Sequence, residues 1–218
     1  MSPALGAVVS VADVRSVTPQ EREELHAAFR QFKVLFLHGA VGLTPDEVVQ
    51  FAELFGQPNV YPRAGFTPED RPGENPFALP VVQEVAPSDI PFGASGWHTD
   101  TPYVPTPPFA TLLYAVEVPG AGLGDTLFGD GVAAFRSLSA GLQAQLRGLR
   151  LLQSSVLRHQ KGVKTLKQTG HLAASAKTPL EAIHPAVRRH PETGEEALYC
   201  ELQYKCQRFW NFISLMQR

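Results

Sequence analysis

Residues 96–103 read GWHTDTPY, and this stretch carries the pattern on which the interpretation of the whole chain depends. His98 and Asp100 are two residues apart, and residues i and i+2 of an extended segment project from the same face. An imidazole and a carboxylate could therefore reach one ion. The same pair also arises by chance in polar loops, where it is an ordinary hydrogen-bonded surface pair, so the surrounding sequence has to decide between the two interpretations.

Imidazole plus carboxylate, with other positions left open, is the ligand set of non-haem Fe(II) sites, which need one more histidine from elsewhere in the chain. The composition suits such a site in one medium domain, or one domain with an appendage. The chain has 218 residues, of which 44% are hydrophobic and 18% charged, and a formal net charge of -2. With 19 prolines and 18 glycines, many turns are expected, which favours a strand-rich architecture over a helix bundle.

The totals also argue against two classes of partner. With 19 lysines and arginines against 21 acidic residues, the totals do not suggest a nucleic-acid-binding surface, which would need an excess and clustering of basic residues. No apolar run approaches the roughly 20 residues of a membrane span. Residues 1–17 lack the basic and apolar regions of a secretory signal. Cys200 and Cys206 are the only cysteines, and without a partnering histidine they are better interpreted as free thiols than as a zinc site. We expect a cytoplasmic protein.

Two helices are predicted by their start signals. Thr18 is placed as an N-cap with Glu21 closing a capping box, so a helix should run from Pro19 to about Phe32. The same pattern at Thr44 predicts a second helix that stops near Gly56. Shorter helices are expected from about residues 131 and 139, and strands at 33–37, 79–85, 109–118, 125–128 and 149–155, followed by a hairpin of 182–189 and 196–199.

Irregular segments are expected at 61–80, 86–95 and 157–179. The last of these carries five lysines and arginines and no acidic residue: Arg158, Lys161, Lys164, Lys167 and Lys177. A solvated surface loop explains most of these side chains. A long connection inside a compact domain is also a common form of active-site lid, and a basic lid would suit an anionic substrate.

Several motifs then occur in one order along the chain. They are VLFL at 34–37, FAxxFG at 51–56, WHTD at 97–100, PP at 107–108, GDTLF at 124–128, HPAVR at 184–188 and HPETG at 190–194. From about residue 10 to Tyr199 the chain resembles the taurine-dioxygenase-like family of Fe(II)- and 2-oxoglutarate-dependent oxygenases. The resemblance implies a mostly β fold with flanking helices, a double-stranded β-helix of the jelly-roll or cupin kind.

The resemblance also implies a chemistry and a set of site residues. Its members use Fe(II), 2-oxoglutarate and O2, and couple decarboxylation of 2-oxoglutarate to succinate with hydroxylation of a small organic substrate. By matching position, His98 and Asp100 would be metal ligands and Thr126 would bind a carboxylate of 2-oxoglutarate. The rim of the substrate pocket would contain Ser95, Trp97 and Tyr103.

The sequence departs from the family after Tyr199. Relatives carry a second histidine ligand downstream of the hairpin, and after it an arginine that pairs with the far carboxylate of 2-oxoglutarate. Residues 200–218 do not match that continuation. We therefore expect an oxygenase domain at 1–199 that lacks its last strands, and a divergent tail at 200–218. The simplest explanation is a truncated or alternatively ended product, whose unpaired edges predict low stability or association, including homo-oligomers.

Another histidine of the chain could replace the missing ligand. His159 and His171 lie in the polar loop, whereas His184 has a structural role by family position. The others are less suited: His190 adjoins a turn, and His26 and His38 precede the core, while Arg188 and Arg208 are nominal candidates for the arginine. Two hypotheses remain open, a dioxygenase of a small, possibly anionic molecule and a non-catalytic fragment that acts through association with a partner.

Overall fold

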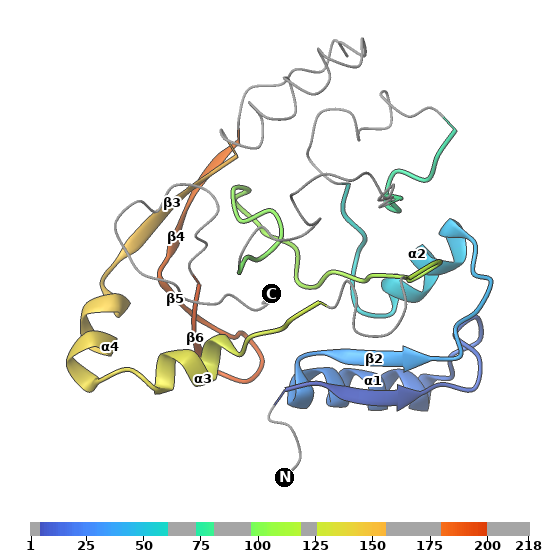
Figure 1. Ribbon diagram of the computed structural model, residues 1–218, viewed down its shortest axis with the longest axis horizontal. Helices are drawn as coiled ribbons and strands as arrows, with labels where there is room; N and C mark the ends of the chain where they lie inside the picture. The colour runs from blue at the N-terminus through green and yellow to red at the C-terminus, as the bar shows by residue number, and fades with distance from the viewer. Residues whose placement is uncertain (1–4, 61–72, 81–96, 119–125, 156–179, 200–218) are drawn as a thin grey trace. The chain divides into compact units, whose positions relative to one another are not determined.

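The chain divides into two units in the computed structural model, which describes residues 5–60, 73–80, 97–118, 126–155 and 180–199 (Figure 1). One unit consists of Met1–Val60 and Leu112–Phe128, and the other of Tyr61–Thr111 and Gly129–Arg218. Several expected features lie outside the described residues: the loops at 86–95 and 157–179, most of the strand at 79–85, Ser95, both cysteines and the tail.

The first unit is built on a parallel strand pair joined by a helix. Strand β1 (Ala7–Ser10) pairs in parallel with β2 (Leu35–His38), and α1 (Pro19–Phe32) forms the crossover between them. Figure 1 shows α1 lying along these two strands. A parallel pair requires such a connection because its strands run in the same direction. The helix at 19–32 and a strand near 33–37 are confirmed, whereas β1 was not expected.

Capping boxes begin both long helices of this unit. The Thr18 hydroxyl accepts a hydrogen bond from the Glu21 backbone N–H at 3.2 Å, and the Glu21 carboxylate accepts one from the Thr18 N–H at 2.9 Å. This backbone hydrogen bond lowers the pKa of Glu21. Thr44 and Glu47 repeat the arrangement at the start of α2 (Pro45–Glu53). Both predicted helix starts are therefore confirmed, because the signal is local.

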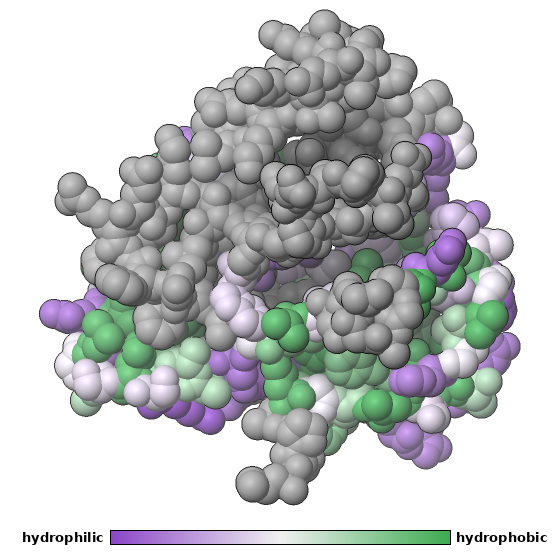
Figure 2. All heavy atoms as spheres, viewed as in Figure 1, coloured by the Kyte–Doolittle hydropathy of each residue, from purple (hydrophilic) through white to green (hydrophobic). Residues whose placement is uncertain are grey.

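The apolar faces of α1 and α2 meet through aromatic rings. Leu25 and Phe51 are buried, and the Phe55 ring packs edge-on against Phe29 and Phe51, with centroids 5.8 and 5.9 Å apart. On β1, Val8 remains 68% exposed. Figure 2 shows hydrophobic residues reaching the surface among charged ones in the region of β1 and β2. None of the helices in the described ranges has the length and apolarity needed to cross a bilayer.

In its described residues, the second unit contains two antiparallel strand pairs and two helices. Strand β3 (Arg150–Ser154) pairs with β4 (Glu181–Pro185), and β5 (Val187–Arg189) pairs with β6 (Glu196–Leu198). The helices are α3 (Gly131–Arg136) and α4 (Ala140–Arg147), and α3 packs against β6. The predicted short helices, the strand near 149–155 and the hairpin are confirmed.

The sequence prediction was wrong for two strands. Residues 109–118 contain no strand although all of them are described, and Val116 is 86% exposed. Residues 126–128 of the strand expected at 125–128 are likewise irregular, with Phe128 packed edge-on against Phe36. An apolar run becomes a strand only where a neighbouring strand accepts its hydrogen bonds. The strands of the described ranges form three two-stranded sheets and do not themselves build the expected barrel.

Candidate metal centre

His98 and Asp100 lie together on an irregular segment of the second unit. The His98 Nε2 and Asp100 Oδ1 atoms are 3.8 Å apart, and the two side chains are 34% and 40% exposed. Ligand atoms about 2.1 Å from one ion and at right angles lie about 3.0 Å apart. A small rotation of either exposed side chain would reach that spacing. The donor set therefore fits two ligands of one metal ion, with the remaining positions open.

Thr111 orients the carboxylate of this pair. Its hydroxyl donates a hydrogen bond to Asp100 Oδ2 at 2.7 Å, which leaves Oδ1 as the oxygen beside His98. Partners of this kind fix a ligating carboxylate and tune its affinity for metal. Sequence reasoning missed Thr111, because a hydroxyl eleven residues after Asp100 matches no ligand pattern and the residue fell within a predicted strand.

The turn directly after Asp100 is buried and strained. Thr101 has a φ of 45°, in the left-handed region that β-branched residues rarely adopt. The turn closes through a 3.3 Å hydrogen bond from the Val104 N–H to the Thr101 carbonyl. Pro102 is among the fully buried residues, and Tyr103 is 3% exposed. Tyr103 thus packs inside this unit, and its predicted contact with substrate stays a prediction.

The structure describes two of the remaining predicted site residues, Trp97 and Thr126. Trp97 is 36% exposed and adjoins His98, and its predicted place on the rim of the substrate pocket stays a prediction. Thr126 is exposed and belongs to the first unit, so its predicted contact with 2-oxoglutarate stays a prediction. Ser95 lies outside the described residues.

The described part of the chain contains no group of three or more His, Cys, Asp or Glu side chains that could hold a metal ion. Of the histidines considered for the third ligand, and the arginines considered for 2-oxoglutarate, His159, His171 and Arg208 lie outside the described residues. His38 is exposed at the end of β2. The others make contacts of their own: His26 Nε2 with the Leu54 carbonyl at 2.7 Å, His184 Nε2 with the Val104 carbonyl at 3.0 Å, His190 Nδ1 with two backbone N–H groups at 3.2 Å, and Arg188 over the Tyr199 ring at 4.6 Å.

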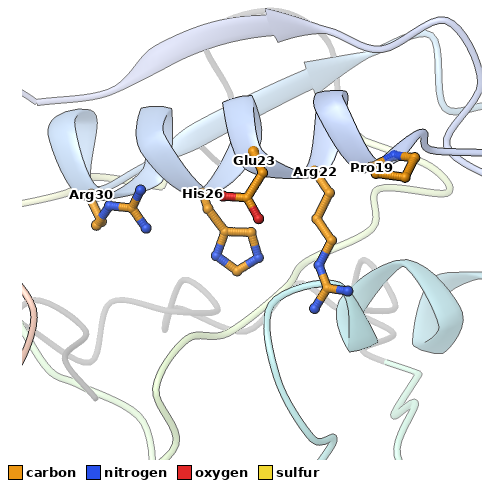
Figure 3. A pocket seen from close by; sticks show the side chains of 5 residues that line it. All are labelled: Pro19, Arg22, Glu23, His26 and Arg30. Atoms are coloured by element: carbon orange, nitrogen blue, oxygen red, sulfur yellow. The ribbon is translucent and has the colours of Figure 1, made fainter.

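A hollow of about 400 Å³ lies on α1 in the first unit, and no predicted site residue lines it. Its lining consists of Pro19, Arg22, Glu23, His26 and Arg30. Figure 3 shows these side chains on the face of α1 turned away from β1 and β2. The His26 ring packs 5.3 Å from the Phe55 ring as well as bonding to Leu54, so the hollow belongs to the packing of α1 on the end of α2.

An imidazole and a carboxylate that can bind one ion, with the other coordination positions of that ion left open, define a candidate mononuclear non-haem metal centre. The family model described as "Taurine catabolism dioxygenase TauD, TfdA family" matches residues 1–214. The chain belongs to the TauD/TfdA family. The alpha-ketoglutarate-dependent dioxygenases of this family use Fe(II) and 2-oxoglutarate with O2, and act on small molecules.

Individual relatives cover most of the chain. An alpha-ketoglutarate-dependent sulfonate dioxygenase of Saccharomyces cerevisiae is 30% identical over 207 residues, which are 91% of this chain and 47% of that protein. Pentalenolactone F synthase of Streptomyces arenae is 28% identical over 89% of this chain and 68% of its own length. The chain thus spans about half the length of the yeast protein.

A solved structure shows the same likeness. The crystal structure of a taurine dioxygenase from Burkholderia xenovorans matches with a TM-score of 0.64 at 26% identity, covering 91% of this chain and 60% of that one. Taurine dioxygenases have the double-stranded β-helix fold that the sequence analysis expected. The described strands pair only two by two and do not by themselves confirm that fold.

Proposed function

We propose that this chain provides the metal-binding part of an Fe(II)- and 2-oxoglutarate-dependent dioxygenase that hydroxylates a small organic substrate. The observation that carries the proposal is the His98–Asp100 pair, at 3.8 Å, with Thr111 holding the second oxygen of Asp100. Membership of the TauD/TfdA family gives this geometry its chemical meaning.

Each residue of the site has a defined task in the proposal. His98 Nε2 and Asp100 Oδ1 would hold the metal, and Thr111 keeps Oδ1 turned toward His98. When bound, iron and 2-oxoglutarate supply the oxidation of a C–H bond by O2, with release of succinate. Thr126 would bind a carboxylate of 2-oxoglutarate through its hydroxyl. Ser95, Trp97 and Tyr103 would face the substrate.

The substrate proposed here is a small anion. The yeast relative is named for sulfonates and the Burkholderia structure for taurine, which is itself a sulfonate. The predicted loop at 157–179, with five basic residues and no acidic one, would suit the same charge. Pentalenolactone F synthase is named for a different reaction, so membership of the family does not by itself fix the substrate.

We further propose that residues 1–199 are the family domain, a jelly-roll barrel, and that residues 200–218 are a divergent tail. The chain spans 60% of the length of the solved taurine dioxygenase. A reducing, cytoplasmic compartment would suit Fe(II) and two free thiols. The comparisons give no support to the alternative of a non-catalytic fragment that acts through association.

An activity assay tests this function. The chain is loaded with Fe(II) without oxygen, and is then exposed to O2 together with 2-oxoglutarate and either small sulfonates or uncharged analogues of them. We expect succinate to form faster with the sulfonates than with the uncharged analogues, and the His98→Ala variant to form none above background. His190→Ala is the matched control, since it changes a histidine of the same unit outside the metal pair. No succinate from a folded chain that binds iron would refute the proposed turnover.

A further inference from the structure

His184 lies on the inner face of β4. Burial alternates along this strand, with Ala182 and His184 buried and Ile183 exposed. The His184 Nε2–H donates a hydrogen bond to the Val104 carbonyl at 3.0 Å, since a carbonyl oxygen only accepts. His184 thus ties the end of the turn after the metal pair to a strand.

This turn needs support from outside itself. Thr101 holds a φ of 45°, and a β-branched residue keeps such a conformation only where its surroundings over-determine it. Its own hydrogen bond, from the Val104 N–H to the Thr101 carbonyl, is long at 3.3 Å. The hydrogen bond from His184 adds a second contact to the same residue, Val104, and it comes from strand β4. Asp100 directly precedes the strained residue, so its direction depends on how the turn is held.

The hairpin holds the His184 ring firmly from the other side. The ring meets Tyr199 edge-on, with centroids 5.5 Å apart and an interplanar angle of 83°. Tyr199 is 2% exposed, and its N–H donates to the Ala186 carbonyl at 2.8 Å. The Arg188 guanidinium covers the Tyr199 ring at 4.6 Å. This packing fixes the position of the His184 ring, so the hydrogen bond of His184 can restrict the position of the turn.

We propose that His184 is a positioning residue for the candidate metal centre. The hydrogen bond from its Nε2–H to the Val104 carbonyl stabilises the strained turn formed by residues 101–104. This turn then fixes the Asp100 side chain in the orientation in which Oδ1 faces His98. The His184 Nε2–H is engaged by the Val104 carbonyl, so this nitrogen supports the turn rather than binding a metal ion. The step from turn to metal rests on the proposed function, whereas the step from His184 to the turn does not.

Three substitutions of His184 separate the hydrogen bond from the ring. His184→Phe keeps a ring and removes the donor, His184→Gln offers an N–H near the place of Nε2, and His184→Asn has the same amide with a shorter reach. The matched control is His190→Phe, a histidine of the same hairpin that contacts the backbone of its own turn. Mn(II) binding, followed by the loss of the free-ion electron paramagnetic resonance signal, is the first measurement.

We expect Mn(II) affinity to fall about tenfold or more in His184→Phe and His184→Asn, as when an outer partner of a metal site is lost. His184→Gln should bind within about threefold of the unmodified chain, and His190→Phe should bind as the unmodified chain does. If His184→Phe does not fold, the difference between the Gln and Asn variants decides the question alone. Equal affinity in all variants would overturn the link to the metal.

Hydrogen–deuterium exchange on the metal-free chain is the second measurement. We expect faster exchange in residues 97–104 of His184→Phe, or of His184→Asn if His184→Phe is unfolded, with β3 unchanged and no such effect in His190→Phe. If the unmodified chain binds no Mn(II) but this exchange pattern appears, the proposed function fails while the hold of His184 on the turn stands. Unchanged exchange at 97–104 would overturn the positioning role itself.

Discussion

At the scale of single residues, the candidate metal pair could be proposed from the sequence because its two residues lie close together along the chain. His98 and Asp100 were singled out by their i and i+2 spacing together with the surrounding motifs, and the structure places His98 Nε2 and Asp100 Oδ1 3.8 Å apart, while their role as metal ligands stays a prediction. The contacts of Thr111 with Asp100 and of His184 with Val104 could not be predicted, since each forms only in the folded chain. The left-handed Thr101 was equally hidden, because β-branched residues disfavour that conformation.

Removing the Thr111 hydroxyl should weaken metal binding without unfolding the chain. Thr111→Val keeps the shape and removes the donor to Asp100 Oδ2. A hydrogen bond to a charged acceptor contributes about 1.5–3 kcal/mol, so the metal dissociation constant should rise about tenfold or more. Calorimetric titration with Mn(II) measures the change. Thr106→Val, at an exposed threonine of the same segment, should leave it unchanged, and an equal effect of both variants would argue against an orienting role.

At the scale of elements, the helices were predictable and the strands only partly. The start of each of α1 and α2 is determined by four consecutive residues, and both capping boxes form as expected. Strands depend on partners far away in the sequence. β1 was missed because its parallel partner β2 is separated from it by the whole of α1, and the apolar run at 109–118 forms no strand in the described structure.

The N-cap of α2 should contribute to the stability of the first unit. Thr44→Ala removes the oxygen that accepts from the Glu47 N–H. Loss of such a cap costs about 1 kcal/mol of unfolding free energy, measurable by urea denaturation. Val41→Ala is the control, since this residue is 78% exposed shortly before the same helix. A Thr44→Ala midpoint equal to that of the control would show that the cap contributes nothing.

Glu47 should make stability depend on pH in acid. Its hydrogen bonds with the Arg15 side chain and the Thr44 backbone lower its pKa from 4.5 to about 2. A carboxyl whose pKa is lower in the folded chain stabilises it when ionised. This contribution is complete above 4.5 and is lost as the pH falls from about 4.5 to about 2.

The Glu47→Gln variant tests this dependence. Urea midpoints measured between those two pH values should fall less steeply with decreasing pH than in the unmodified chain. Glu53→Gln, at an exposed position of the same helix, should keep the original slope. If Glu47→Gln follows the original slope too, the Arg15 contact at 2.6 Å does not persist in solution.

At the scale of the whole molecule, the comparison with relatives says more about the fold than the predicted strands do. The TM-score of 0.64 relates the chain to a taurine dioxygenase, although the described strands pair only two by two. One of these pairs exposes two apolar side chains: Leu152 on β3 and its register partner Ile183 on β4 are 59% and 58% exposed. Exposed apolar surface of this kind favours association.

We therefore expect the chain to self-associate. Sedimentation velocity should show a sedimentation coefficient that rises with protein concentration, and the double variant Leu152→Thr with Ile183→Thr should reduce that rise. Threonine is β-branched, which suits a strand, and it adds a hydroxyl. Val8→Thr, at an exposed strand residue of the other unit, serves as the comparison. A monomer at every concentration would contradict the expectation.

The most direct test of the metal centre is an anaerobic titration of the chain with Fe(II) and 2-oxoglutarate, followed in the visible spectrum. We expect the metal-to-ligand charge-transfer band of the chelate to appear, to be lost in His98→Ala and to persist in His190→Ala. A folded chain that shows no band at saturating iron and 2-oxoglutarate would contradict the assignment of His98 and Asp100 as ligands of a working oxygenase site.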